Sequence, residues 1–409
     1  EELFASPSLS SFWRIFAFEY ALPSELFFFA QNVLCATIFS ENGTRQGSAL
    51  GGFFFCVGVH PVLRDIAARF PAVRLYAYMD DITLSCPDPA VLEQALLFAK
   101  ARFAQIGLEC NTSKCEWFGP AAAPAAVQDI VRARPAVLKV LGAFFGPENL
   151  VEEKIFEKLE KHAVFFTRLA ALDPSTCSFA LLRSCALPRL NYMLRTHAPH
   201  LTHRTAQEFD SKVFSTLISW AGVFPDNNVA THAALPIRMG GLGLVPQNSI
   251  ATFAFDASRA AAFRDLPRPG FLPPPPPQDP EDDGRPTEPP TQHSATLIFQ
   301  KNLRDVFLAA NPGRKRHLDE CGEKGAGAWL SASRFDFRGP AFAAALRYRL
   351  CAPPAGSAAQ LACPGCSLIF PAALFDSHAA GCVKIAGQNA TKKHNSVVKF
   401  LSDLCDHAS

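Results

Sequence analysis

Short apolar runs separated by polar turns characterise the first part of the chain. Residues 72–77 and 82–86 are two β-prone runs, so they predict a hairpin whose tip is residues 78–81. Residues 53–63 form an apolar stretch of helical character, and residues 138–142 resemble another strand. The pattern predicts an α+β fold in which helices pack on a small antiparallel sheet.

The pattern beyond residue 150 is helical. Residues 152–172 carry apolar side chains at helical spacing among lysines and glutamates, and residues 178–198 predict a second helix that Pro188 interrupts. A third helix is expected over residues 205–221. Residues 8–40 also look helical, although this stretch belongs to the first part of the chain.

A proline-rich segment divides the helical part. Residues 266–290 contain 11 of the 33 prolines, and an acidic cluster follows the longest proline run. Proline runs favour an extended polyproline II conformation, so we interpret the segment as a spacer. An SH3-type docking site is the alternative, which the lack of a flanking basic anchor disfavours. The expected divisions are 1–150, 151–265, a disordered linker 266–294, and a helical region 295–409.

Composition narrows the class of protein. The formal charge of +2 is nearly neutral, so no global basic field indicates a polyanionic partner. Residues 295–409 carry 14 Lys and Arg against 8 Asp and Glu, a local balance of +6. The 13 cysteines are scattered through a long chain, which suggests reduced thiols rather than a secreted disulfide framework. No stretch is long and apolar enough to predict a membrane span, and we expect a soluble intracellular protein.

Two adjacent carboxylates lie at the expected hairpin tip. Asp80 and Asp81 concentrate negative charge between two apolar runs, which a divalent cation would neutralise. Hard oxygen ligands of this kind suit Mg²⁺, which retains several waters and also binds substrate phosphates. The alternative is that the aspartates only solvate a turn, where Asp is common.

Neighbouring motifs favour the metal site. Residues 43–50 read G-T-R-Q-G-S-A-L, residues 78–81 read Y-M-D-D, residues 107–116 contain G-L-x-x-N-x-x-K-C-E, and residues 138–142 contain L-G. In this order and spacing the chain resembles the reverse transcriptase of non-LTR retrotransposons. Residues 235–244 resemble the L-P-x-x-x-G-G-L-G-L segment that follows the thumb in many such elements.

The resemblance implies a fold and an activity. The fold would be a right-hand polymerase palm that lacks its fingers and first catalytic strand, followed by an α-helical thumb. The activity would be RNA-directed DNA polymerisation primed at nicked target DNA. Its partners would be an element RNA template, a DNA primer and deoxynucleoside triphosphates, in the nucleus after synthesis in the cytoplasm. Oligomeric state is left open.

The resemblance also assigns roles to residues. Asp80 and Asp81 would hold the catalytic Mg²⁺ or Mn²⁺ ions, and Lys114 would lie near the departing pyrophosphate. The nucleotide or template would contact Tyr78, Arg45, Gln46 and Gly47.

One expected catalytic residue is missing from the motifs. A polymerase palm needs a further metal-binding aspartate on its first strand, and residues 1–42 contain no aspartate. Glu19 is the weak alternative, because a helical glutamate lacks the required strand geometry. We therefore expect this chain to be a fragment that begins after the first catalytic carboxylate and is inactive by itself.

A second group of candidate ligands lies near the end of the chain. Cys363, Cys366, His378 and Cys382 have the spacing C-x2-C-x11-H-x3-C, which is typical of a tetrahedral zinc site. Four unrelated residues are the alternative.

A basic segment follows the expected zinc site. It includes Lys392, Lys393 and His394, and it resembles the R-H-N segment that opens the restriction-like endonuclease of early-branching elements. We expect these residues to contact nucleic acid, and we expect no cutting activity, because the nuclease acidic motif is absent.

Two other functions stay open. A domesticated, non-catalytic nucleic-acid-binding protein would tolerate the missing aspartate. A group II intron maturase shares the polymerase motifs, although the zinc pattern argues against it.

Overall fold

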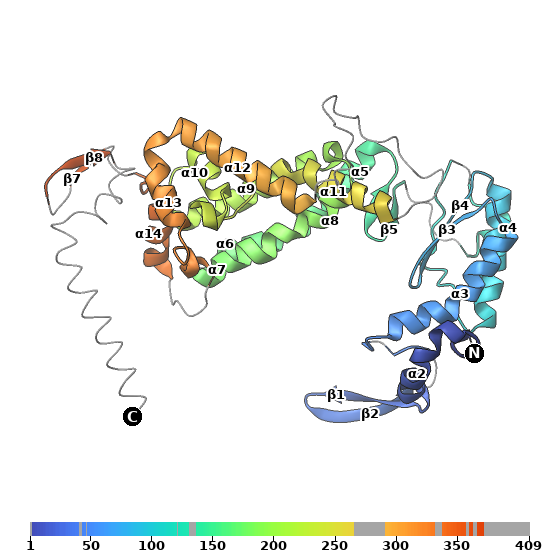
Figure 1. The fold of residues 1–409 in the computed structure, drawn as a ribbon. Helices are drawn as coiled ribbons and strands as arrows, with labels where there is room; N and C mark the ends of the chain where they lie inside the picture. Colours follow the sequence, from blue (N-terminus) through green and yellow to red (C-terminus); the bar gives the residue numbers. More distant parts are fainter. Residues whose placement is uncertain are drawn as a thin grey trace, which may run out of the picture. The chain divides into compact units, whose positions relative to one another are not determined.

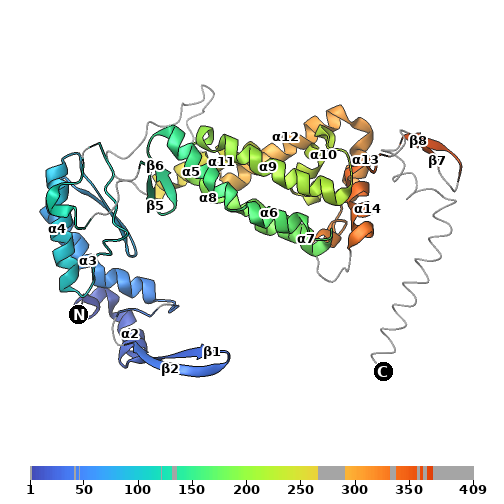
Figure 2. The same cartoon turned by 180° about the vertical axis from the view of Figure 1, so that it is seen from behind.

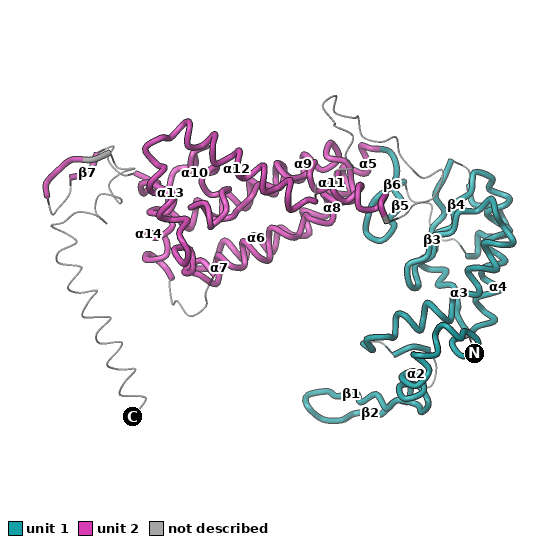
Figure 3. The backbone as a smooth tube through the Cα atoms, viewed as in Figure 1, with its two compact units in different colours: residues 1–147 teal, residues 148–409 magenta. Residues whose placement is uncertain are grey.

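The computed structural model describes most of the chain, in two compact units of residues 1–147 and 148–409 (Figure 3). The described residues are 2–40, 43–45, 47–120, 122–130, 136–265, 291–331, 338–356, 360–362 and 366–371. The proline-rich linker expected at 266–294 therefore lies almost entirely outside the described residues. No helix in the described part is long and apolar enough to cross a membrane.

The first unit combines helices with two-stranded antiparallel sheets (Figure 1). Its elements are α1 (Glu2–Ala5), η1 (Pro7–Phe12), α2 (Trp13–Tyr20), β1 (Ser24–Ala30), β2 (Val33–Ser40), α3 (Gly51–Arg69), β3 (Arg74–Tyr78), β4 (Asp81–Ser85), α4 (Pro89–Gln105), η2 (Ala125–Val127), β5 (Leu138–Val140) and β6 (Ala143–Phe145). The strands pair β1 with β2, β3 with β4, and β5 with β6. Helices with small antiparallel sheets confirm the α+β class.

The helix expected over residues 8–40 is wrong in its second half. Residues 24–40 form the β1–β2 hairpin, whose turn residues Gln31 and Asn32 both have positive φ. Two successive left-handed residues are what a tight hairpin requires, and Asn accepts that conformation. The flanking Phe, Val, Ile and Thr residues favour strands. Local β propensity therefore outweighs the helical reading of the apolar pattern.

The core of the first unit joins α3, α4 and the β3–β4 hairpin. Val62 and Ile66 of α3 are buried with Phe103 of α4, and Ile82 and Leu84 of β4 pack against this cluster. Asp88 begins α4, because its side chain accepts a hydrogen bond from the Ala90 backbone N–H at 2.8 Å. Apolar contacts with α3 and α4 thus hold the hairpin that carries the paired aspartates.

The second unit is a helical bundle (Figure 2). Its elements are α5 (Glu148–Glu160), α6 (Ala163–Ala170), α7 (Thr176–Ala180), η3 (Leu181–Ala186), η4 (Leu187–Leu190), α8 (Asn191–Thr196), α9 (Pro199–Ala221), α10 (Asn227–Ala234), η5 (Ile237–Met239), α11 (Gln247–Asp265), α12 (Gln292–Ala310), η6 (Pro312–Arg314), α13 (Lys315–Gly322), η7 (Ala328–Leu330), α14 (Gly339–Leu350), β7 (Gln360–Ala362) and β8 (Ile369–Pro371).

The expected break at Pro188 is confirmed. A π-helical turn, η3, and a 3₁₀ turn, η4, separate α7 from α8, and Pro188 lies in the second of them. Proline lacks the backbone N–H that a continuous α-helix needs, so the backbone hydrogen-bond pattern of the helix changes there. The single helix expected over residues 152–172 is divided into α5 and α6.

One hydrophobic core runs through the second unit. Phe209 and Trp220 of α9 are buried in the same cluster as Phe179 of α7 and as Phe342 and Leu350 of α14. The division expected between residues 151–265 and 295–409 therefore does not separate two cores, because α14 completes the core that the earlier helices begin. Contacts between residues this distant in sequence cannot be read from local periodicity.

A buried arginine fixes the glycine-rich segment 235–244. Arg349 is only 2% exposed, and it donates from Nε to Gly241 O and from Nη2 to Ile237 O, both at 2.8 Å. A Cβ at Gly241 would lie 2.1 Å from Leu235 O, so the loop tolerates no side chain there. Burial lowers the pKa of the Arg349 guanidinium from its ordinary value. Two carbonyl oxygens of the loop thus accept hydrogen bonds from a cation that is buried in the core.

We predict that Arg349→Met lowers the unfolding free energy of the second unit by roughly 3–5 kcal/mol, because Gly241 O loses its Arg349 donor and Ile237 O keeps only the Gly240 N–H. Urea denaturation measures the change. Arg316→Met is the matched control, since Arg316 is exposed and pairs only with Glu320. Equal stability of both variants would contradict the assignment.

A buried histidine makes the second unit sensitive to acid. His232 is fully buried and lies next to Leu350, with its Nδ1 at 3.2 Å from the Leu350 carbonyl oxygen. Burial, followed by the charges of His317 and Arg314, lowers the pKa of His232 to about 3. The imidazole therefore stays neutral in the folded protein.

We predict that the free energy of unfolding falls as the pH drops below about 6.5. Below that pH, His232 binds a proton in the unfolded chain but stays neutral in the folded chain. Above that pH the free energy of unfolding keeps its full value, and at pH 5 it is lower by roughly 2 kcal/mol. The measurement compares denaturation of the wild type and His232→Gln at pH 7 and pH 5. Both proteins retain His317 and Asp210, so parallel pH curves would refute the role of His232.

Candidate active site

The paired aspartates lie at a two-residue hairpin turn. Tyr78 of β3 pairs with Asp81 of β4, which leaves Met79 and Asp80 as the turn residues. Met79 has φ +52°, a left-handed conformation that a non-glycine residue adopts at some cost. Both carboxylates are exposed, and the Tyr78 side chain is 62% exposed beside them. The turn thus presents two carboxylates and an aromatic ring on one exposed tip.

Met79 anchors this turn to α3. Its sulfur lies 3.8 Å from Cys56 Sγ, and a Cβ at Gly52 would lie only 2.9 Å from its terminal methyl. α3 begins directly after the residue 43–50 motif, so the aspartate turn contacts the helix that this motif precedes. Local sequence patterns do not predict this contact, although the Gly51-Gly52 pair at the start of an apolar helix is a signal for a close approach.

Residues 43–50 are tied to the end of α2. The Arg45 backbone N–H donates to Tyr20 Oη at 3.1 Å, and its guanidinium donates to Leu22 O at 3.3 Å. The guanidinium carbon also lies 5.2 Å from the Tyr20 ring centroid, which is a cation–π distance. In this arrangement Arg45 stabilises the motif itself.

The structure describes Gly47 of this motif but not Gln46, and it gives Glu19 a partner within the motif. Gly47 has φ +90° with open space around it, so glycine is required for the backbone conformation rather than for a close approach. Gln46 lies outside the described residues. Glu19, the alternative third metal ligand, accepts a hydrogen bond from Ser48 Oγ at 2.8 Å.

Lys114 lies on an exposed turn. Asn111 Oδ1 accepts from the Ser113 N–H at 3.1 Å, and the Lys114 N–H donates to Asn111 O at 2.9 Å. This side-chain-assisted turn holds the backbone and leaves the Lys114 side chain exposed. No hydrogen bond or ion pair in the described residues joins it to the aspartate turn. Its expected place near a departing pyrophosphate stays a prediction.

The metal-binding capacity of the described residues is limited. No group of three or more His, Cys, Asp or Glu side chains within them could hold a metal ion. Asp80 and Asp81 offer hard oxygen donors, which fit Mg²⁺ when water and substrate phosphates complete its coordination.

Of the four expected zinc ligands, the structure describes only Cys366. Cys366 is half-buried just before β8, and its companions Cys363, His378 and Cys382 lie outside the described residues. Lys392, Lys393 and His394 lie outside them too. The cysteines in the described part are free thiols.

Comparison with known proteins relates this site to a polymerase family. Residues 9–143, about a third of the chain, match the family model described as reverse transcriptase (RNA-dependent DNA polymerase). By family resemblance the segment is thus that of an RNA-directed DNA polymerase. No solved structure matches the chain.

A curated relative narrows the resemblance to retrotransposons. The retrotransposable element SLACS 132 kDa protein of Trypanosoma brucei gambiense is 27% identical over 259 residues, which are 62% of this chain and 21% of that protein. The chain spans about a fifth of the length of that relative. The resemblance to a retrotransposon reverse transcriptase that the motifs predict is confirmed.

We predict that Gly52→Ala stabilises the first unit less than Gly58→Ala does, although both replace glycine within α3. Replacing a helical glycine by alanine gains roughly 1 kcal/mol. At Gly58 nothing lies within 4 Å of the new Cβ, whereas at Gly52 the Met79 methyl must move. Urea denaturation measures both gains.

A double variant separates this contact from helix propensity. Adding Met79→Ala should restore the full gain at Gly52 and leave the gain at Gly58 unchanged. A gain at Gly52 that Met79→Ala leaves unchanged would show that Met79 does not contact α3.

Proposed function

We propose that this chain is the palm and thumb part of a non-LTR retrotransposon reverse transcriptase, which extends a nicked DNA primer on an RNA template. The observation that carries the proposal is the Tyr78–Asp81 turn, held against the helix that follows the residue 43–50 motif. The family match over residues 9–143 and the retrotransposon relative support the reaction class. Localisation would be nuclear.

Asp80 and Asp81 would hold the catalytic Mg²⁺ ions. When bound there, these ions supply charge neutralisation of the triphosphate and activation of the primer hydroxyl. The backbone of the β3–β4 turn fixes the two carboxylates in adjacent positions, and Met79 fixes the turn against α3. Tyr78 offers its exposed ring to a sugar or base, and Lys114 would neutralise the leaving pyrophosphate.

The second unit would act as the thumb. Its helices carry arginines that are placed by contacts with aromatic rings, as where Arg204 lies 4.1 Å from the Phe156 ring centroid and Arg189 lies 4.0 Å from that of Phe165. Such cations suit the phosphates of a template and primer duplex. A zinc ion held by Cys363, Cys366, His378 and Cys382 would order the end of the chain next to the basic residues Lys392, Lys393 and His394.

We predict that Asp80→Asn and Asp81→Asn each weaken Mn²⁺ binding by about tenfold or more, since each removes a charged ligand from a site that has few. Electron paramagnetic resonance measures the free Mn²⁺. Asp88→Asn is the matched control, because Asp88 caps α4 rather than contributing to the turn. Unchanged Mn²⁺ affinity in both turn variants would remove the metal site.

Primer extension tests the polymerase itself. We expect the 409-residue chain alone to give no extension product, because two carboxylates without a third leave the two-metal arrangement incomplete. The assay uses an annealed DNA primer on an RNA template with Mg²⁺ or Mn²⁺. Robust synthesis that Asp80→Asn abolishes would overturn the expected inactivity and support the polymerase.

A non-catalytic role is the second candidate. Such a protein would need only the nucleic-acid-binding surfaces, and the arginines that aromatic rings hold in the second unit are consistent with it. Primer–template binding that does not depend on Asp80 and yields no extension after an upstream aspartate strand is supplied would favour this role.

A further inference from the structure

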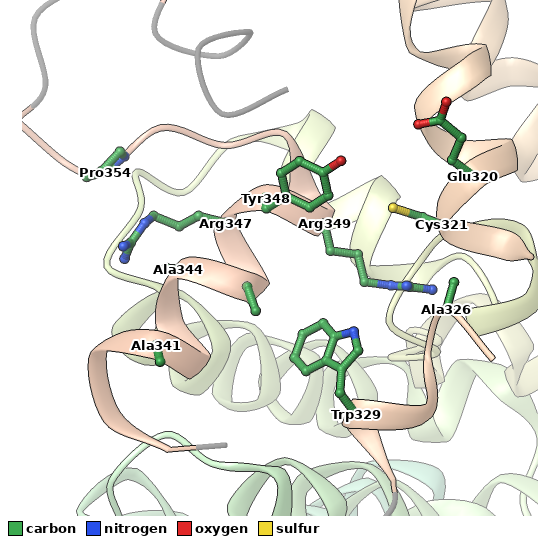
Figure 4. Close-up of a pocket in the computed structure, with 11 residues that line it drawn as sticks. Glu320, Cys321, Ala326, Trp329, Ala341, Ala344, Arg347, Tyr348, Arg349 and Pro354 are labelled. Carbon is green, nitrogen blue, oxygen red and sulfur yellow. The ribbon is translucent and has the colours of Figure 1, made fainter. Parts of the chain in front are cut away.

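The second unit contains a cavity that the polymerase assignment does not use. It has a volume of about 580 Å³, within the range of small-molecule sites (Figure 4). Trp329 and Tyr348 supply its aromatic side chains. Three small residues of α14 leave space beside these rings: Ala341, Ala344 and Ala345. Trp329 is held by an edge contact with the buried Phe342, at 5.3 Å between ring centroids.

An incompletely paired cation lines this cavity. Figure 4 shows the Arg349 side chain between Trp329 and Cys321. A guanidinium has five N–H groups, and Arg349 uses Nε and Nη2 on the carbonyls of Gly241 and Ile237. Within the described part of the chain its Nη1 has no acceptor, and no carboxylate forms an ion pair with it. A cation this deeply buried favours a ligand that accepts hydrogen bonds.

A second cation lines the cavity. Arg347 Nη1 donates to Ala221 O at 2.9 Å, which holds this side chain. The Glu320 carboxylate is exposed, accepts from Arg316 Nε at 2.8 Å and points away from Trp329 (Figure 4). The cavity therefore combines flat rings with the Arg349 donor and a second cation.

We propose that this cavity binds one unstacked nucleobase of a single-stranded nucleic acid. The base would lie against Trp329 and accept a hydrogen bond from Arg349 Nη1, while Arg347 meets a phosphate of the same strand. Unpaired bases are recognised in this way, by stacking on aromatic rings and hydrogen bonds to their edges. The choice of partner rests on the proposed function, because a retrotransposon polymerase handles single-stranded RNA.

A nucleobase suits the cavity better than an aromatic peptide side chain does. A phenylalanine would fill the space beside Trp329 but leave the Arg349 Nη1 donor without an acceptor. Leaving a donor unpaired beneath a bound ligand weakens binding, whereas a base satisfies it.

Binding of a fluorescein-labelled RNA pentamer to the full chain tests the proposal, in buffer without Mg²⁺ so that the aspartate turn does not contribute. Anisotropy reports affinity, and quenching of tryptophan fluorescence reports stacking. Ala344→Met fills the cavity from an exposed position, and Ala310→Met on α12 is the matched control. We expect roughly tenfold weaker binding in Ala344→Met, and unchanged binding in Ala310→Met.

Two further measurements distinguish stacking from other contacts. Trp329→Phe should remove most of the quenching while retaining some affinity, and an abasic pentamer should bind Ala344→Met and wild type equally. Wild-type affinity in Ala344→Met, or equal binding of the normal and abasic pentamers to the wild type, would overturn the proposal. So would a phenylalanine-containing peptide that competes with the pentamer. Because the assay needs no synthesis, its failure is distinct from failure of primer extension.

Discussion

The second unit depends on the pairing of one buried guanidinium with the carbonyls of a glycine-rich loop. Residues 235–244 turn through left-handed glycines and direct carbonyl oxygens into the core, where each needs a donor. Arg349 supplies two N–H groups from α14, and the neighbouring Arg347 donates to the last residue of α9. Polar contacts therefore fix the register of α14, while the apolar faces provide most of the burial.

The same pairing explains why residues on both sides of the proline-rich segment share a core. An unpaired carbonyl in the protein interior is costly, so the loop is stable only when α14 is present. The space left between Arg349, Trp329 and α14 is a consequence of this arrangement, because a guanidinium shared between loop and cavity cannot be fully covered by apolar side chains. The same side chain thus stabilises the loop and lines the cavity.

The first unit is built on a different principle. Its aspartates lie on an exposed turn. Apolar contacts of β4 with α3 and α4 hold this turn, and so does the contact of Met79 with α3. Exposed carboxylates are accessible to a cation, while the packed helices limit their movement. The two units thus differ in construction, since the first presents exposed carboxylates and the second encloses a buried cation.

The sequence by itself determined the family resemblance and several local features of this protein. The Asp80–Asp81 turn, the order of the motifs, the α+β class and the break at Pro188 follow from local patterns, because turns, caps and proline act within a few residues. Local patterns failed over residues 24–40, where helical and strand readings of an apolar run compete. They also could not place Met79 on Gly52, or Arg349 under Gly241. Those contacts join residues far apart in sequence, and only packing in three dimensions selects which distant partners satisfy a buried charge or fill a gap.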